Sequence, residues 1–150
     1  MISKALEEYL KTIYLLKTQN GNIRVTDIAN KMNCSKAGVN KAINNLKANE
    51  LINYETYGTI ELTSKGEDLA KKILETYDII HLFFKDVIGL DDEKAKQEAE
   101  KVKSVITDDT VNKLAKYTHK TLGLYSLDCQ YDVNQERCRS CKRRQIERRE

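Results

Sequence analysis

Apolar residues recur every three or four positions over most of the chain, which is the spacing of helix faces that pack against a core. The fold class that this pattern predicts is mostly α. Six helices are expected, at about residues 2–18, 26–32, 35–49, 64–87, 91–106 and 107–123. Capping side chains are expected at the starts of five of these helices: Thr26, Ser35, Ser64, Asp91 and Thr107.

Between the third and the fourth of these helices the pattern changes to short extended runs. Residues 51–55 and 59–62 are rich in β-branched, aromatic and aliphatic side chains, and a tight turn at Tyr57 and Gly58 separates them. Two short strands directly after a helix, a turn and a helix are typical of a winged helix-turn-helix. We therefore expect an N-terminal winged helix-turn-helix, a DNA-binding fold, over residues 1–70.

The helix expected at 35–49 has one apolar and one cationic face. Val39, Ile43 and Leu46 fall on the apolar face, whereas lysines and asparagines fall on the other. No aspartate or glutamate occurs from residue 28 to residue 49. Duplex DNA carries about one negative charge per ~1.7 Å of its axis, so a cationic helix without acidic neighbours suits the major groove. A charged face that only meets solvent is the alternative, and the order of the elements favours DNA.

Nine positions are predicted to contact double-stranded DNA: Thr26, Ser35, Lys36, Ala37, Asn40, Lys41, Lys47, Tyr57 and Gly58. Asn40 and Lys41 have side chains that can read base edges in the major groove. Thr26, Ser35 and Lys47 are expected to hold phosphates, which position a protein without reading sequence. The tip of the wing is expected to reach the adjacent backbone or the minor groove.

Composition narrows the class of protein. The 150 residues include no proline, and charged residues make up 33% of the chain, as in mostly helical soluble proteins. No apolar run approaches the ~20 residues of a membrane span, and the N-terminus does not form a signal peptide, so we expect a cytoplasmic protein with no membrane partner. An enzyme is not expected, because the chain has only two histidines and lacks a Gly-rich phosphate loop, an HExxH motif and a Ser/His/Asp order.

The rest of the chain is expected to form a helical dimerisation and effector domain at 71–123 and a basic, cysteine-containing tail at 124–150. The helices after residue 64 carry more apolar surface than a winged domain of about 70 residues can cover. A homodimer would bury that surface, and it would present two recognition helices to the half-sites of a palindromic operator. A monomer with one thick core is the alternative.

Four separated blocks carry a family likeness: EYLKTIY at 8–14, RVTDIA at 24–29, LTSKG at 62–66 and IGLDDEK at 88–94. In this order they resemble the DtxR/MntR family of diphtheria-toxin-repressor-like, metal-dependent transcriptional regulators, over about residues 3–117. The resemblance implies a homodimeric repressor of iron or manganese homeostasis. Such a repressor binds a palindromic operator when its effector metal is loaded.

The resemblance also implies a manganese or iron site between the first, fourth and fifth helices. Of the family's ligands, Glu8, His81 and Glu100 remain in this chain. Other ligand positions are changed, to Tyr77, Lys96, Lys103 and Ser104. A lysine ammonium only donates hydrogen bonds and repels a metal ion. Two alternatives stay open: the remaining groups hold divalent iron or manganese weakly, or Lys11 or Lys103 pairs with Glu8 or Glu100 and no metal binds.

Three cysteines follow the matched region: Cys129, Cys138 and Cys141. The last two form a CxxC pair among arginines and lysines, which would lower the pKa of the thiols. A cytosolic protein rarely uses such cysteines for structural disulfides, and thiolates bind soft centres. An iron–sulfur cluster, a structural zinc ion, or a redox thiol pair or unliganded tail all stay open. A fourth ligand would come from Asp128, His119, a partner chain or an exogenous group.

Two further expectations complete the sequence-based picture. Cys34, in the turn before the recognition helix, is expected to be a small buried hydrophobe. The alternative function is a metal- or cluster-binding redox protein that uses the winged helix as a scaffold, without sequence-specific DNA binding. A third hypothesis assigns most of the DNA affinity to the basic tail, where six of the seven arginines lie after residue 136.

Overall fold

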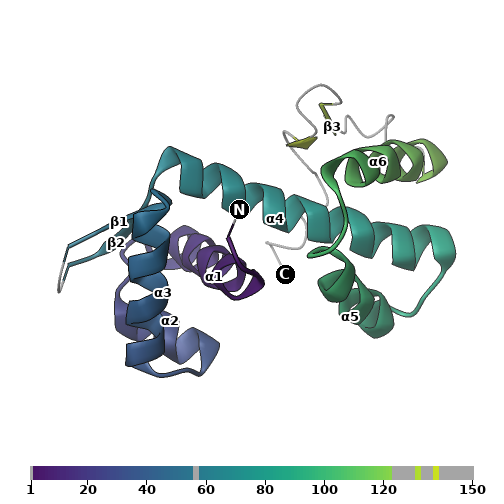
Figure 1. Cartoon of the computed structure of the whole chain (residues 1–150). Coiled ribbons are helices and arrows are strands. Elements are labelled where there is room, and N and C mark those ends of the chain that lie inside the picture. The colour runs from purple at the N-terminus through teal and green to yellow at the C-terminus, as the bar shows by residue number, and fades with distance from the viewer. Residues whose placement is uncertain (1, 56–57, 123–130, 133–136, 139–150) are drawn as a thin grey trace. The chain divides into compact units, whose positions relative to one another are not determined.

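The computed structural model describes residues 2–55, 58–122, 131–132 and 137–138 (Figure 1). Helices and strands follow in the order α1 (Lys4–Asn20), α2 (Val25–Met32), α3 (Lys36–Ala48), β1 (Ile52–Tyr54), β2 (Ile60–Leu62), α4 (Ser64–Leu82), the π-helix η1 (Phe83–Ile88), α5 (Asp92–Val102), α6 (Asp108–Leu122), β3 (Tyr131–Asp132) and β4 (Arg137–Cys138). The predicted mostly α fold with a small wing is confirmed. The chain divides into two compact units, residues 1–73 and 74–150. We call them the winged-helix unit and the helical unit and describe each by itself.

The core of the winged-helix unit lies among α1, α2 and α3, each of which packs against the other two. Apolar side chains from all three helices are buried there: Leu10, Ile13, Ile28, Val39, Ile43 and Leu46. Their spacing of three or four residues places them on one side of each helix, so the opposite side of α3 stays exposed. This arrangement presents α3 on the surface of the unit.

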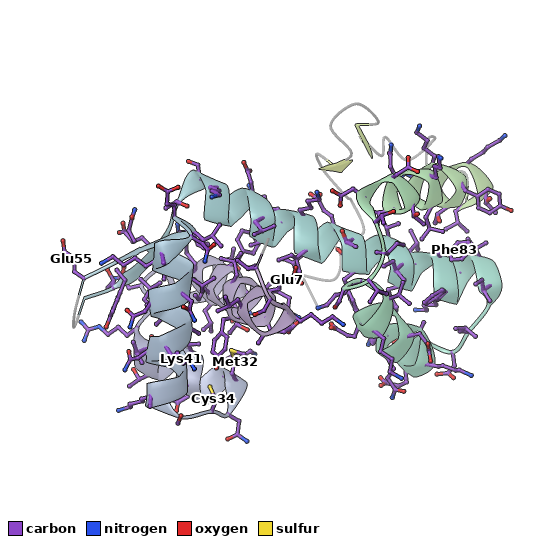
Figure 2. All side chains as sticks on the ribbon, in the orientation of Figure 1. Glu7, Met32, Cys34, Lys41, Glu55 and Phe83 are labelled. Atoms are coloured by element: carbon purple, nitrogen blue, oxygen red, sulfur yellow. The ribbon has the colours of Figure 1, made fainter. Side chains whose placement is uncertain are left out.

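The wing is an antiparallel hairpin of β1 and β2, with Ile52 opposite Leu62 and Tyr54 opposite Ile60. Ile52 and Ile60 are buried, whereas their neighbours toward the other face are exposed, which is the alternation of a half-buried strand. Figure 2 shows Glu55 toward the tip of this hairpin, at the end away from the helices. The predicted wing is therefore present, at 52–54 and 60–62.

A close backbone contact fastens the base of the wing to the start of α4. A Cβ on Gly66 would lie 1.9 Å from the carbonyl oxygen of Leu51, so only glycine fits this position. The same Leu51 oxygen accepts the backbone N–H of Thr63 at 3.1 Å. The Thr63 hydroxyl donates to the Glu50 carbonyl oxygen at 2.7 Å and accepts the Gly66 N–H at 3.0 Å. Thr63, and not Ser64 as predicted, therefore caps α4, because its hydroxyl serves both contacts.

Of the other predicted helix caps, some are confirmed and one is wrong. Ser35 and Asp91 each accept a backbone N–H three residues on, from Gly38 at 3.1 Å and from Lys94 at 3.0 Å, as expected. The predicted cap at Thr26 is wrong, because α2 already begins at Val25. Asp27 accounts for the earlier start, since its carboxylate accepts the backbone N–H of Arg24 at 2.8 Å.

In the helical unit, the long helix predicted to reach Val87 changes its hydrogen-bond pattern before its end. The α-helix stops at Leu82 and continues as η1, which Gly89 closes at a φ of 88°. Both α5 and α6 contact η1. Phe83 contacts Tyr117 of α6 edge-on, with ring centroids 6.5 Å apart. π-helical turns are rare and often lie at functional sites. The residues around η1 are therefore candidate site residues.

Candidate DNA-binding face and effector site

The exposed side of α3 carries the side chains that the sequence predicted to contact DNA. We call this surface the recognition face; its members are Lys36, Ala37, Asn40, Lys41, Asn44 and Lys47, all exposed. Val39, Ala42, Ile43 and Leu46 on the opposite side are buried in the core. Figure 2 shows Lys41 on this helix. The packing therefore holds the helix by its apolar side and leaves its cationic side outward.

The lysines of the recognition face are not neutralised. Lys36 and Lys41 make no ion pair with any residue in the part of the chain that the structure describes. The N-terminal turn of α3 adds to this positive field, because its N–H groups and the helix dipole favour negative charge. A phosphate backbone is the ligand that such a face would attract.

Lys47 differs from the other cations of this face. Its Nζ donates to the carbonyl oxygen of Tyr54 at 2.9 Å, so it joins the last turn of α3 to β1. Thr26 is exposed on α2, and Gly58 closes the hairpin turn by donating its N–H to the Glu55 oxygen at 2.7 Å. Tyr57 lies outside the described residues. The sequence did not predict the hydrogen bond between Lys47 and the wing, because the residue type does not specify which acceptor a lysine contacts.

Cys34 lies in the turn between α2 and α3 (Figure 2). It is half-buried, and not buried as expected. The hydroxyl of Tyr9, from α1, donates to Cys34 Sγ at 3.8 Å. This hydrogen bond raises the pKa of Tyr9 above its ordinary value. Tyr9 thus supports the turn that orients α3, a role that the sequence analysis missed.

The residues predicted to remain from the family's metal site are held in ion pairs. Glu8, in the winged-helix unit, lies 2.8 Å from Lys11 Nζ. Glu100, in the helical unit, lies 2.7 Å from Lys103 Nζ, and only 4% of the Lys103 side chain is exposed. These are the two pairs that the metal-free alternative predicted.

His81 is buried and contacts Asp92, a residue that the sequence analysis did not select. Its Nε2 lies 3.0 Å from Asp92 Oδ1, and because a carboxylate only accepts, that nitrogen carries the proton. The rings of His81 and Tyr77 stack at 5.8 Å. Burial raises the pKa of Tyr77. In this arrangement the Nε2 of His81 is engaged with Asp92.

Asp92 also accepts two lysine ammonium groups. Lys96 Nζ lies 3.0 Å from Oδ2, and Lys85 Nζ lies 3.3 Å from Oδ1. Hydrogen bonds from Lys96 and His81 hold the pKa of the Asp92 carboxyl well below its usual range. We call these four residues the Asp92 cluster. It joins α4, η1 and α5 around one carboxylate.

This donor set does not fit a divalent metal. Within residues 2–55, 58–122, 131–132 and 137–138, no group of three or more histidine, cysteine, aspartate or glutamate side chains is placed to hold a metal ion. In the helical unit, the carboxylates of Asp92 and Glu100 already accept ammonium groups. Of the tail cysteines, Cys129 and Cys141 lie outside the described residues, and only the backbone of Cys138 is described, in β4.

Two family comparisons decide the class of protein. Residues 1–60 match "Iron dependent repressor, N-terminal DNA binding domain", and residues 63–121 match "Iron dependent repressor, metal binding and dimerisation domain". The chain belongs to the iron-dependent repressor family. The family consists of transcriptional regulators, so the predicted DtxR/MntR resemblance and the expectation that the chain is not an enzyme are both confirmed.

Relatives and solved structures agree with this membership. The chain is 34% identical over 120 residues to the HTH-type transcriptional regulator MJ0568 of Methanocaldococcus jannaschii, which covers 79% of this chain and 96% of that protein. It is 28% identical over 114 residues to the regulator MntR of Bacillus subtilis, covering 76% and 80%. The solved metal-dependent regulator MtsR is 25% identical with a TM-score of 0.68, and the manganese regulator SloR is 28% identical with a TM-score of 0.64.

These two solved regulators extend beyond the region that this chain matches. The matches cover 79% and 75% of this chain but only 53% of the MtsR chain and 52% of the SloR chain. This chain therefore spans about half the length of either one. No helix among the described residues is long and apolar enough to cross a membrane.

Proposed function

We propose that this chain is a homodimeric transcription regulator, acting as a repressor, that binds a palindromic operator in double-stranded DNA through the recognition face. The observation that carries the proposal is the placement of an acid-free cationic helix face outward by the packing of α1, α2 and α3. Membership in a family of metal-dependent repressors supports it. The genes that it is proposed to control are those of iron or manganese homeostasis.

The contacts with DNA are assigned by side-chain chemistry. Asn40 and Lys41 read base edges, because amide and ammonium groups match the donors and acceptors of the major groove. Lys36 and Ala37 lie beside them in the first turn of α3. Thr26, Ser35 and Lys47 are assigned to phosphate contacts. The wing tip, Tyr57 and Gly58, is assigned to the adjacent DNA backbone. These groups position the protein and carry no base code.

The homodimer is proposed to form through the domain at 71–123. Among the described residues of the helical unit, three large apolar side chains are exposed: Ile88 by 54%, Val105 by 70% and Tyr117 by 58%. We propose that the second copy covers these side chains, because apolar surface at an interface is removed from water. The match of residues 63–121 to a dimerisation domain supports this assignment. Residues 1–70 would then present the DNA-binding helices.

The effector is proposed to bind at Cys129, Cys138 and Cys141, in the tail at 124–150. The cysteine spacing and the surrounding cations support an iron–sulfur cluster, with zinc as the second candidate. Metal and sulfide content, with the absorption spectrum, should be measured on protein purified without oxygen. Iron with acid-labile sulfide that is lost on Cys→Ser substitution of all three cysteines is the expected result. Zinc alone would indicate a structural zinc site in the tail. Manganese or iron retained in the variant would assign the effector to Glu8, His81 and Glu100 instead.

The test of DNA binding is fluorescence anisotropy with two duplexes of equal length. One contains the DNA upstream of the chain's own gene, and the other contains the same bases in scrambled order. Tighter binding to the first, weakening as salt rises, is expected because the contact combines base readout with phosphate neutralisation. Equal affinity for both duplexes at every salt concentration would favour the redox-protein alternative. A truncation after Leu127 that abolishes all binding would assign the affinity to the tail.

A further inference from the structure

We infer that the helical unit uses lysine ammonium groups where its family uses a divalent metal, so that the chain reaches its DNA-binding state without such a metal at α4 and α5. The inference rests on the proposed function as far as DNA is concerned. Its structural part concerns the Asp92 cluster and the Glu100–Lys103 pair, both within one unit.

The Asp92 cluster cross-links the helices of this unit. Asp92 belongs to α5, whereas His81 is on α4 and Lys85 is in η1. Their contacts with one carboxylate, at 3.0 and 3.3 Å, tie the end of the α4–η1 helix to the start of α5. A metal ion with ligands from several helices has the same mechanical effect. The cross-link is already made by protein groups.

Positive charge already lies beside the carboxylates of Asp92 and Glu100. Lys103 places an ammonium group 2.7 Å from Glu100 with only 4% of its side chain exposed, and Lys96 places another 3.0 Å from Asp92. A divalent cation that approached either carboxylate would meet a fixed positive charge within a few ångströms. At such distances like charges repel strongly unless water screens them. Lys103 therefore neutralises Glu100 and excludes a competing cation, whereas Lys96, with 47% of its side chain exposed, neutralises Asp92 under partial screening by water.

The test begins with the response of the full chain to metal. All proteins carry Cys→Ser at Cys129, Cys138 and Cys141, so that the tail does not bind the probe. The melting temperature Tm is measured in 1 mM EDTA and in 1 mM MnCl₂, and bound Mn²⁺ is measured by electron paramagnetic resonance. The expected result is a Tm that differs by less than about 1 °C between the two buffers, with no bound Mn²⁺, because a ligand that does not bind does not stabilise. A rise of several degrees in Mn²⁺, or one equivalent bound, overturns the inference.

The variant Lys96→Glu reverses the charge at the Asp92 cluster. It places a new carboxylate next to Asp92 and His81, which is a donor set that Mn²⁺ accepts. Its Tm should fall in EDTA and rise by about 5 °C in MnCl₂, with Mn²⁺ bound. The matched control is Lys101→Glu, an exposed lysine on the same helix, which should not respond to Mn²⁺. A Lys96→Glu protein that is indifferent to Mn²⁺ contradicts the claim that an ammonium group takes the cation's place.

Two further measurements keep the outcome decisive. If Lys96→Glu does not fold, Lys103→Glu places a carboxylate one turn from Glu100 and tests the same claim. DNA affinity is then compared in EDTA and in MnCl₂ with the chain whose three tail cysteines are intact, because the proposed effector binds at those cysteines. Equal binding in both buffers is expected, and binding that occurs only with Mn²⁺ overturns the inference but leaves the proposed function intact. Absence of binding in both buffers overturns the proposed function, whereas the Tm results still decide the structural part.

Discussion

Lysine has opposite roles on the recognition face and in the ion pairs of the helical unit. On the recognition face, Lys36 and Lys41 are exposed and make no ion pair within the described residues. In the helical unit, Lys85, Lys96 and Lys103 each lie within 3.3 Å of a carboxylate oxygen. The same side chain therefore serves as an unneutralised charge on the recognition face and as a counter-ion around Asp92 and Glu100. The neighbouring acidic residues decide which role it has.

This difference shows how a regulator can separate its binding charge from its structural charge. An unneutralised lysine attracts DNA from solution and releases counter-ions when it binds. A lysine in an ion pair contributes little long-range field, because its partner cancels it. If this comparison holds, substitutions of the recognition-face lysines change the salt dependence of DNA binding, whereas substitutions in the Asp92 cluster leave that dependence unchanged.

The largest expected effect comes from reversing one charge on the recognition face. Lys41→Glu should weaken operator binding by roughly 100-fold, because it removes a base contact of about 1–3 kcal/mol and adds repulsion from the phosphates. Anisotropy titration against the operator measures the change. The control Lys101→Glu has the same charge change on α5 and should alter affinity less than about twofold. An equal loss of operator affinity in the two variants would show that the recognition face has no special role in DNA binding.

The second effect concerns how the winged-helix unit holds its recognition face. Gly66→Ala forces a methyl group against the Leu51 carbonyl oxygen, which lies 1.9 Å from the position of the new Cβ. We expect the free energy of unfolding to fall by about 1–3 kcal/mol, which is the usual range for overpacking. Urea denaturation measures it, with the exposed neighbour Ser64→Ala as control. A variant as stable as the parent would show that this contact does not fasten the wing.

The third effect separates phosphate contact from base readout. Lys47→Ala should weaken binding to all sequences about fivefold and reduce the slope of log K against log salt by about 1, since one phosphate contact is lost. Loss of the bond to Tyr54 should also loosen the wing, which faster hydrogen exchange in β1 would reveal. A change in sequence preference with an unchanged salt slope would instead make Lys47 a base-reading residue.

The smallest effect is expected in the Asp92 cluster. Lys85→Ala removes a half-exposed ammonium group, and partly exposed ion pairs contribute about 0–1 kcal/mol. The free energy of unfolding should therefore fall by less than about 1 kcal/mol, and the salt slope of DNA binding should not change. Thermal melting and anisotropy measure the two quantities. A reduced salt slope in this variant would place Lys85 on the DNA interface and contradict the division of roles.

Local patterns determined most of the fold. The period of apolar residues placed all six helices, and β-rich runs placed the wing, because each depends on neighbours a few positions away. The same period separated Val39, Ile43 and Leu46 from the face that carries Lys41. The caps of α2 and α4 were missed because Asp27 and Thr63 both make contacts that a residue-type preference does not include.

The sequence by itself determined the class of fold, the order of its elements, the cationic face of α3 and the departure from the family's metal ligands. Only the tertiary structure decided the partners of the charged residues. His81 and Asp92 meet across a turn between two helices, and Lys85 joins them from η1. Gly66 likewise meets the backbone of Leu51, fifteen positions earlier. Side-chain periodicity specifies which face a residue occupies, whereas the group that it contacts depends on where the packing of other elements places that group.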